Sequence, residues 1–483
     1  MSVRPRNLLS ILLLPLVVAC LCLSGWAADA LTQGIAAFNR GDFATAIEHL
    51  TAAAQESPDD APVLSWLGSA QLRAGQHEDA RLTLAKAVEL DPKQPESLNN
   101  LGSACWALGE AKEAIEHYQQ SIYLQPHYSA PHYNLGTVYL SMEDFAKAIG
   151  EFSVAVDLDP ENAGAHNNLG VAYERSGKLE DAIASYGKAV ELQPGNQSVR
   201  LNLALVLRSA GRIDEAVQHL SRLVAADSKE AAVYLNLGLI RYEKESDYRS
   251  ALSAFRRAVA LDANNSAAHY NLGLCARQLG LLEEAKQHFE KAVNINPKFV
   301  NAHINLGAME LDEGDAAAAV DHFAAALKVD PESYSASFNL GLAYERIGSE
   351  EDVIRVWAAL RERAPDDPGV REALAATYFR LHRYDDAKRE YQALIRLRPN
   401  DLVAHNNLGI IYEEFGQFDE ALDAYRSALL IDPNYAPAHN NLGVLYERQG
   451  KTEFAILEYR AALAADPSLE DAQRNLDRLV SPE

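Results

Sequence analysis

The chain has 483 residues, a length that usually corresponds to about three globular domains. Its 68 acidic residues against 44 basic ones give a formal charge of -24 at pH 7, which argues against nucleic acid and anionic membranes as main partners. Of the four cysteines, Cys20 and Cys22 lie near the N-terminus, and we expect Cys105 and Cys275, at apolar helical positions, to be small core residues. The pattern does not predict a disulfide framework.

Residues 1–26 have the design of an export leader, with Arg4 and Arg6 before an apolar run that Pro15 interrupts. Soluble export is one interpretation, with cleavage near Ala27. A lipoprotein is the second, because Val-Val-Ala-Cys at 17–20 resembles a lipobox and would leave Cys20 lipidated. The third is an uncleaved anchor, although 16 apolar residues fall short of the roughly 20 needed to span a bilayer. All three predict an exported protein in the periplasm or membrane-anchored in the cell envelope, if the cell is bacterial.

Residues 27–469 repeat one 34-residue pattern thirteen times, with a single one-residue insertion in the seventh copy. Ala163 to Asn196 shows the pattern most clearly. Its apolar residues are spaced as two helical stripes, and Gly177 and Pro194 break the chain after each stripe. Each copy therefore predicts a helix, a turn, a second helix and another turn, which we call helix A and helix B.

At two positions of the repeat, the packing of the helices explains which residue type recurs. Position 8 is glycine or alanine in every copy, which predicts that helix A lies too close to helix B for a larger side chain. Position 32 is proline in eleven copies and ends helix B. The sixth, seventh, tenth and eleventh copies depart most from the pattern.

These residues resemble the tetratricopeptide repeat (TPR). In Ala163 to Asn196 the matching residues are Leu169, Gly170, Tyr173, Ala182, Tyr186, Ala189 and Pro194, and only His166 departs from the family pattern. The resemblance implies an all-α fold, a right-handed superhelical solenoid of about thirteen helix-turn-helix repeats. After Pro467, one helical face carries Leu469, Ala472, Leu476, Leu479 and Val480, which predicts that residues 470–483 form a helix and tail that cap the last repeat.

Position 6 of helix A faces away from helix B on a helical wheel and is asparagine in ten copies. Thr32, Trp66 and Ala373 break the series in the first, second and eleventh copies. Asparagine is a poor helix residue, so its recurrence needs a reason. A row of primary amides matches the alternating N–H and C=O groups of an extended peptide. The candidate peptide-binding residues are Asn100, Asn134, Asn168, Asn202, Asn236, Asn271, Asn305, Asn339, Asn407 and Asn441.

The Asn-Leu-Gly triplet at positions 6 to 8 further resembles the TPR superhelix of the O-linked N-acetylglucosamine transferases, whose position 6 asparagines hold extended peptide. The resemblance covers the ten asparagines and not the catalytic domain of that family. The alternative is that the asparagines bond to the neighbouring repeat and hold the stack together. Position 9, mainly apolar, is expected to pack between successive helices or to supply apolar pockets beside the amides.

Position 4 is histidine in six copies, and we expect satisfied core or groove histidines there rather than metal ligands. The phosphate-binding, zinc-protease, nucleophile-elbow and CxxC motifs are all missing from the sequence. The sequence thus predicts a non-catalytic scaffold without cofactor or metal, which binds extended segments of other proteins in the cell envelope. The alternative is an adaptor subunit for a separately encoded glycosyltransferase or polysaccharide-export machine. A carbohydrate-binding solenoid would predict aromatic stripes, and position 6 offers only Trp66.

Overall fold

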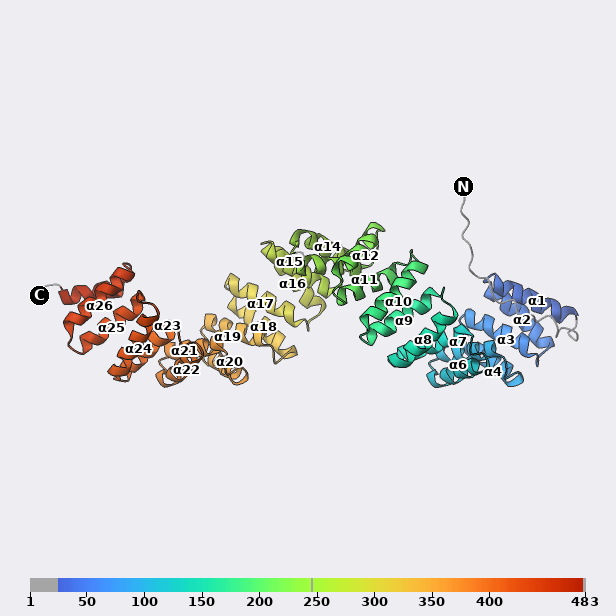
Figure 1. Cartoon of the computed structure of the whole chain (residues 1–483), viewed down its shortest axis with the longest axis horizontal. Coiled ribbons are helices and arrows are strands. Elements are labelled where there is room, and N and C mark those ends of the chain that lie inside the picture. The colour runs from blue at the N-terminus through green and yellow to red at the C-terminus, as the bar shows by residue number, and fades with distance from the viewer. Residues whose placement is uncertain (1–24, 245, 481–483) are drawn as a thin grey trace. The chain divides into compact units, whose positions relative to one another are not determined.

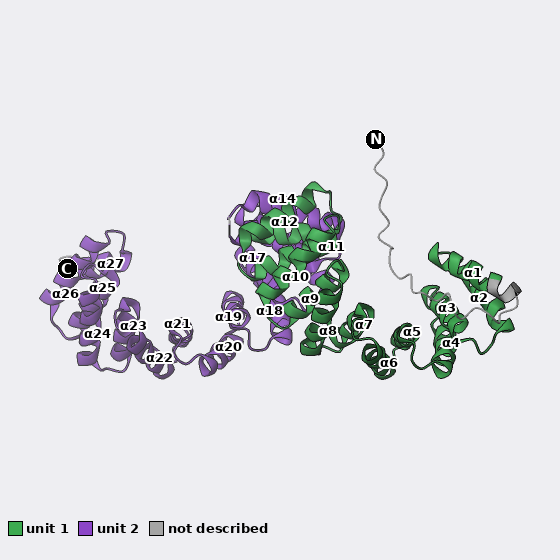
Figure 2. Ribbon diagram, turned by 45° about the vertical axis from the view of Figure 1, so that its right-hand side comes forward, with its two compact units in different colours: residues 1–240 green, residues 241–483 purple. Residues whose placement is uncertain are grey.

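The computed structural model describes residues 25–244 and 246–480, with side chains from Asp29 onward, and contains 27 helices and no strand in that part of the chain (Figure 1). The predicted leader and Cys20 lie outside the described residues. The chain divides into two compact units, residues 1–240 and 241–483 (Figure 2). The division falls within the helix A of the seventh repeat, the copy that carries the insertion.

The first thirteen helices are α1 (Gly25–Asn39), α2 (Phe43–Glu56), α3 (Ala61–Arg73), α4 (His77–Leu90), α5 (Pro95–Ala107), α6 (Ala111–Leu124), α7 (Ser129–Ser141), α8 (Phe145–Leu158), α9 (Ala163–Arg175), α10 (Leu179–Leu192), α11 (Gln197–Ser209), α12 (Ile213–Ala225) and α13 (Ala231–Glu243). The remainder are α14 (Tyr248–Leu261), α15 (Ser266–Gln278), α16 (Leu282–Ile295), α17 (Val300–Glu313), α18 (Ala316–Val329), α19 (Tyr334–Ile347), α20 (Glu350–Arg363), α21 (Pro368–Arg380), α22 (Tyr384–Leu397), α23 (Leu402–Glu414), α24 (Phe418–Ile431), α25 (Ala436–Arg448), α26 (Thr452–Ala465) and α27 (Glu470–Val480). Odd-numbered helices up to α25 are helices A, and even-numbered helices are helices B. The fold is an all-α superhelical solenoid, as predicted.

The helix ends follow from local chemistry. At the start of α9 the Asn162 side chain accepts a hydrogen bond from the Ala165 backbone N–H at 3.0 Å, which satisfies one of the free donors of the first turn. The turn between helix A and helix B needs a left-handed residue, and Gly177 supplies it with φ of 78°. Glu143 and His382 stand at the same place in the fourth and eleventh repeats with φ of 60° and 56°.

The small residue at position 8 lets helix A contact helix B, as the sequence predicted. A Cβ atom added at Gly170 would lie 2.7 Å from Cδ1 of Tyr186, a fully buried side chain of α10. A Cβ at Gly341 would lie 2.6 Å from Cζ2 of Trp357, in the tenth repeat. The close approach is therefore kept even where the aromatic residue of helix B changes.

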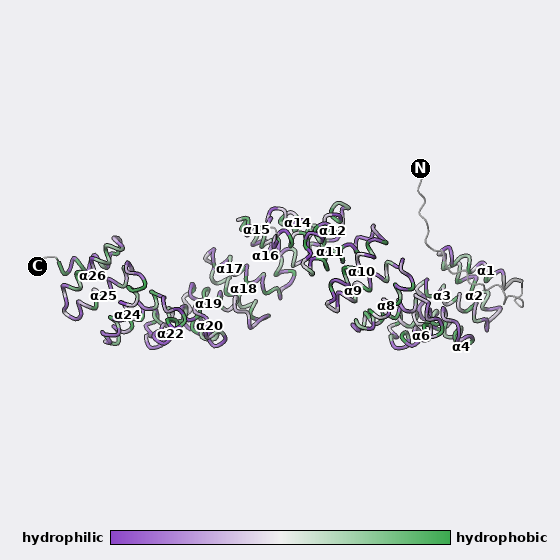
Figure 3. Tube along the Cα trace, viewed as in Figure 1, coloured by the Kyte–Doolittle hydropathy of each residue, from purple (hydrophilic) through white to green (hydrophobic). Residues whose placement is uncertain are grey.

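The apolar core of each unit continues from repeat to repeat instead of closing around one centre. In the first unit one cluster of buried residues extends from Ala80 of α4 to Ala172 of α9. In the second unit another extends from Val353 of α20 to Ile411 of α23. Along the helices, hydrophobic and hydrophilic residues alternate (Figure 3), as expected when one side of each helix packs on its neighbours.

The last helix, α27, packs against α26. Ala472 is fully buried, and Leu476 and Leu479 pack on the core of the last repeat. Val480, predicted to lie on the same apolar face, is 50% exposed.

No helix within residues 25–244 and 246–480 combines the length and the apolar character that crossing a membrane requires.

Candidate functional site

The position 6 asparagines and the position 9 residues form a recurring surface on helices A, which we call the A face. Nine of the ten asparagines are half-buried, and Asn236 is buried with 8% exposure. The seven apolar residues at position 9 are half-buried as well: Val171, Leu205, Leu239, Leu274, Leu342, Ile410 and Val444. Seven repeats therefore present an amide beside a partly open apolar side chain.

Seven of these asparagines donate their side-chain amide to the preceding repeat. In five cases the acceptor is the side chain at position 5 of that repeat. Asn134 Nδ2 donates to Asn99 Oδ1 at 2.9 Å, and Asn168 Nδ2 donates to the Tyr133 hydroxyl at 3.2 Å. The same contact joins Asn202 to Asn167, Asn305 to Tyr270, and Asn441 to Asn406. Asn100 donates to Ser69, and Asn407 to the Tyr391 hydroxyl.

Where two asparagines occupy positions 5 and 6, the amides form a chain that crosses several repeats. Asn475 of α27 donates to Asn440, which donates to Asn441, and Asn441 donates to Asn406. Asn406 in turn donates to Asn407. Such a chain fixes the orientation of each amide plane, and it stabilises the stacking of successive repeats by about 1 kcal/mol per bond.

Three asparagines donate within their own helix. Asn236 donates to the Ala232 carbonyl and Asn271 to the Ala267 carbonyl, both at 2.8 Å. Asn305 also contacts its own helix, through the Asn301 carbonyl at 2.8 Å, and accepts from Arg277 Nη1 at 2.6 Å. For Asn236 and Asn271, this back-bonding satisfies an amide where position 5 of the preceding repeat is a leucine and cannot accept.

Sequence reasoning missed the role of position 5. The signal was present, because asparagine or tyrosine at position 5 precedes an asparagine at position 6 of the next copy, 35 residues later, in five cases. The contact depends on how one repeat stacks on the next, which periodicity alone does not give. Part of the hydrogen-bonding capacity of each amide is therefore used within the chain. A primary amide has two N–H donors and two acceptor lone pairs, so capacity for a ligand is left.

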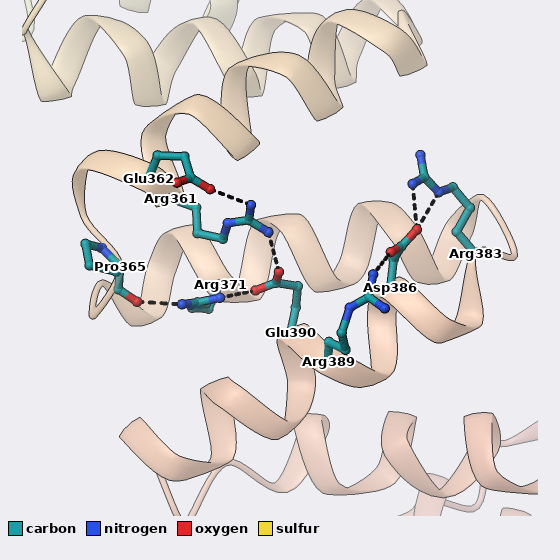
Figure 4. Close-up of polar contacts among 8 residues, drawn as sticks. All are labelled: Arg361, Glu362, Pro365, Arg371, Arg383, Asp386, Arg389 and Glu390. Carbon is teal, nitrogen blue, oxygen red and sulfur yellow. Dashed lines mark hydrogen bonds and ion pairs between the residues drawn. The ribbon is translucent and has the colours of Figure 1, made fainter.

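The eleventh repeat has Ala373 in place of the asparagine, and there an ion cluster links the repeats (Figure 4). The Glu390 side chain of α22 is 5% exposed and accepts from Arg371 Nη1 of α21 at 2.5 Å and from Arg361 Nη1 of α20 at 2.8 Å. Arg371 Nε also donates to the Pro365 carbonyl at 3.0 Å. A buried carboxylate held by two guanidinium groups from different helices fixes the register of the tenth and eleventh repeats.

The six position 4 histidines share one contact, which confirms that they are satisfied side chains. The Nε2 atom of each lies 3.0–3.2 Å from the backbone carbonyl at position 32 of the preceding repeat. The residues are His132, His166, His269, His303, His405 and His439. Since a carbonyl only accepts, this contact assigns the proton to Nε2.

Cys105 and Cys275 are free and buried, as expected of core residues. Burial raises the pKa of each thiol to about 11, so the thiolate that oxidants and electrophiles attack is rare at neutral pH. In the part of the chain that the structure describes, His, Cys, Asp and Glu side chains do not converge in groups of three or more that could hold a metal ion.

Family models match most of the repeat region. Models described as "Tetratricopeptide repeat" or "TPR repeat" match residues 37–101, 310–377, 390–423, 414–450 and 438–473. A model described as "Cilia and flagella-associated protein 70 C-terminal domain" matches residues 95–295. These models name the repeat in general, so the narrower resemblance to O-linked N-acetylglucosamine transferases stays a prediction.

Among solved structures, MamA is 30% identical over 35% of this chain and 92% of its own, with a TM-score of 0.32. A tetratricopeptide repeat protein from Parabacteroides merdae is 18% identical over 52% of this chain and 99% of its own, with a TM-score of 0.37. YrrB, described as a TPR protein with an unusual peptide-binding site, is 21% identical over 45% of this chain and 95% of its own, with a TM-score of 0.30. A comparison with curated proteins gives no match.

Proposed function

Because the chain is a tetratricopeptide repeat protein, we propose that it is a scaffold that binds extended segments of partner proteins along the A face. Proteins built from this repeat are generally non-catalytic scaffolds for protein–protein interaction. The observation that carries the finer proposal is the recurrence, in seven repeats, of a position 6 amide beside a half-buried apolar residue at position 9. An extended peptide offers its own N–H and C=O groups at regular intervals, and each repeat can meet one of them.

The hydrogen bonds that the asparagines form between repeats are compatible with peptide binding on the A face and favour it. Asn168 and six of its counterparts are held in one orientation by the preceding repeat, so a peptide that binds them does not have to order these side chains. Each amide contact would contribute about 1 kcal/mol net. Micromolar affinity requires about 8 kcal/mol, so several consecutive repeats and their position 9 side chains must act together.

The test replaces Asn168, Asn202 and Asn236, in three consecutive repeats of the first unit, with alanine. We expect partner affinity to fall at least about tenfold, since three contacts of about 1 kcal/mol are lost. The matched control is Tyr133→Phe, which removes the hydroxyl that Asn168 contacts and leaves the amide in place. Affinity is measured by titration of a captured partner, and stability by melting temperature.

Two outcomes would contradict the proposal. One is a triple variant that binds as the parent protein does. The other is a control that loses affinity and stability as much as the triple variant, because the asparagines would then act through stacking alone.

We also propose that the protein is exported, with residues 1–26 as the leader. The support is the order of basic, apolar and small residues in that segment. Mass spectrometry of the mature N-terminus from the native source tests this proposal. A start near Ala27 indicates soluble export, a diacylated Cys20 indicates a lipoprotein, and an intact Met1 on a cytoplasmic protein contradicts export.

A further inference from the structure

The residues at positions 4 and 23 contact each other across helices A and B, and in three repeats they form an ion pair. His132 Nδ1 lies 2.7 Å from Glu151 Oε2, and His439 Nδ1 lies 2.6 Å from Glu458 Oε2. In the eleventh repeat Arg371 contacts Glu390. A carboxylate at position 23 thus neutralises the cationic side chain at position 4.

In the eighth and ninth repeats a second histidine replaces that glutamate. The Nδ1 atoms of His269 and His288 are 3.0 Å apart, and those of His303 and His322 are also 3.0 Å apart. The ninth repeat has a carboxylate next to its pair, since Glu310 Oε1 lies 3.5 Å from His322 Nε2. In the eighth repeat the nearest recorded carboxylate, Glu284, lies 4.0 Å from His288 Nε2.

Glu284 is already engaged by another cation. Arg256 Nη2 donates to both of its carboxylate oxygens at 2.8 Å, and Arg256 Nε donates to Oε1 at 3.1 Å. Lys291, one turn after His288 on α16, is exposed, and it forms no ion pair with another residue that the structure describes. The other acid that acts on the pair is Asp262, exposed in the turn after α14.

A cleft with a volume of 460 Å³ lies between α14 and α16, over the start of α15, and the histidine pair is part of its lining. We call it the α14–α16 cleft. Its polar lining residues are Arg256, His269, His288, Lys291 and Asn294, with no carboxylate among them. Two comparable clefts in the chain differ in this respect. The cleft between α4 and α6 is lined by Glu89, Glu110 and Glu113, and the cleft between α22 and α24 by Glu420 and Asp423.

The hydrogen bonds also locate the protons of the pair. His269 Nε2 donates to the Ala263 carbonyl, so Nδ1 of a neutral His269 accepts and His288 Nδ1 donates. His288 Nε2 is then the ring nitrogen that takes up a further proton. With that proton in place, His288 adds a positive charge to those of Arg256 and Lys291 in the lining of the cleft, while Glu284 is already bound by Arg256.

We propose that the α14–α16 cleft binds a carboxylate group of an acidic segment of a partner protein. The carboxylate supplies the negative charge that a position 23 glutamate supplies in the fourth, eleventh and thirteenth repeats. This site lies on α14 and α16, with His269 of α15 at its base, and does not depend on peptide binding at the A face.

Binding is coupled to proton uptake by the histidine pair. Burial, followed by His269 and Lys291, lowers the pKa of His288 to about 4, and Glu284 opposes this effect. A bound carboxylate favours the protonated form and raises that pKa. Between the free and the bound pKa the affinity therefore increases as pH falls, by at most about tenfold per pH unit.

The experiment is isothermal titration of the full chain with a tetraglutamate peptide, acetylated and amidated at its ends, at pH 5.5 and 7.5. Repeating it in two buffers of different ionisation enthalpy measures proton uptake. The decisive variant is His288→Glu, which restores the carboxylate found in the equivalent pairs and blocks the site. The matched control is His322→Gln, in the equivalent pair of the next repeat. Melting temperature reports whether each variant is folded.

We expect tighter binding at pH 5.5 with proton uptake, at least a tenfold loss of affinity in His288→Glu, and unchanged affinity in His322→Gln. The Asn168, Asn202 and Asn236 triple variant should bind tetraglutamate as the parent does, which separates this site from the A face. Absence of tetraglutamate binding, equal binding by folded His288→Glu, or tighter binding of inorganic phosphate than of tetraglutamate would overturn the proposal.

Discussion

At the scale of single residues, replacing glycine by alanine should have opposite consequences at two glycines of the fifth repeat, one on α9 and one on α10. Gly170 faces Tyr186 so closely that an added Cβ would lie 2.7 Å from the ring, whereas a Cβ on Gly187 of α10 would meet no atom within 4 Å. Gly170 therefore serves the contact between helices, and Gly187 only lowers helix propensity.

We predict that Gly170→Ala destabilises the protein by about 1–3 kcal/mol, because Tyr186 must move out of a packed core. Its matched control, Gly187→Ala, should stabilise the protein by about 0.5–1 kcal/mol through helix propensity. Urea denaturation followed by circular dichroism measures both. A neutral or stabilising effect of Gly170→Ala would contradict the close approach of the two helices.

At the scale of helix pairs, the histidines at positions 4 and 23 give opposite pH dependences to different repeats. In the thirteenth repeat the hydrogen bond with Glu458 raises the pKa of His439. This pair stabilises the folded state at pH values below the pKa of His439 in the unfolded chain. The stabilisation is lost as pH rises through the pKa of His439 in the folded chain. In the eighth repeat the pKa of His288 is lowered to about 4 from 6.5. As pH falls, this histidine is therefore protonated in the unfolded chain before it is protonated in the folded one, and the folded state loses stability.

We predict that α15 and α16 lose protection from hydrogen exchange when pH falls from 7.5 to 5, while α25 and α26 gain it. For His288 alone, the free energy of unfolding is expected to fall by about 2 kcal/mol at pH 5. Exchange rates corrected for the intrinsic effect of pH, followed by mass spectrometry of peptides from both segments, measure the difference. A change of the same sign in both helix pairs would refute the assignment.

At the scale of the whole molecule, stability and binding both arise from repetition. Each repeat contacts its neighbours, so a substitution acts mainly on its own repeat and the next. Binding along the A face adds contributions from several repeats, and each contribution is small. One substitution at position 6 should therefore have little effect on partner affinity, whereas three in consecutive repeats should have a large one.

The sequence predicted the features that depend on local periodicity. The helix pairs, the small residue at position 8 and the buried cysteines were all expected, because spacing and residue size determine them. Bonding of the asparagines to the neighbouring repeat was one of the two predicted alternatives, but the acceptors at position 5 were not predicted, since they depend on how one repeat stacks on the next. The cluster of Arg361, Arg371 and Glu390 and the histidine pairs at positions 4 and 23 were not predicted either, because they depend on three-dimensional contacts.

The central claim is that partners bind as extended segments on the A face. Photocrosslinking with benzoylphenylalanine at Val171, at position 9 beside Asn168, tests it most directly in the native source. Lys188, an exposed residue of α10, is the control site on helix B. The account predicts crosslinks from position 171 to short linear stretches of partner proteins, lost when Asn168, Asn202 and Asn236 are replaced by alanine. Crosslinks that form equally from position 188, or that persist in the triple variant, would contradict it.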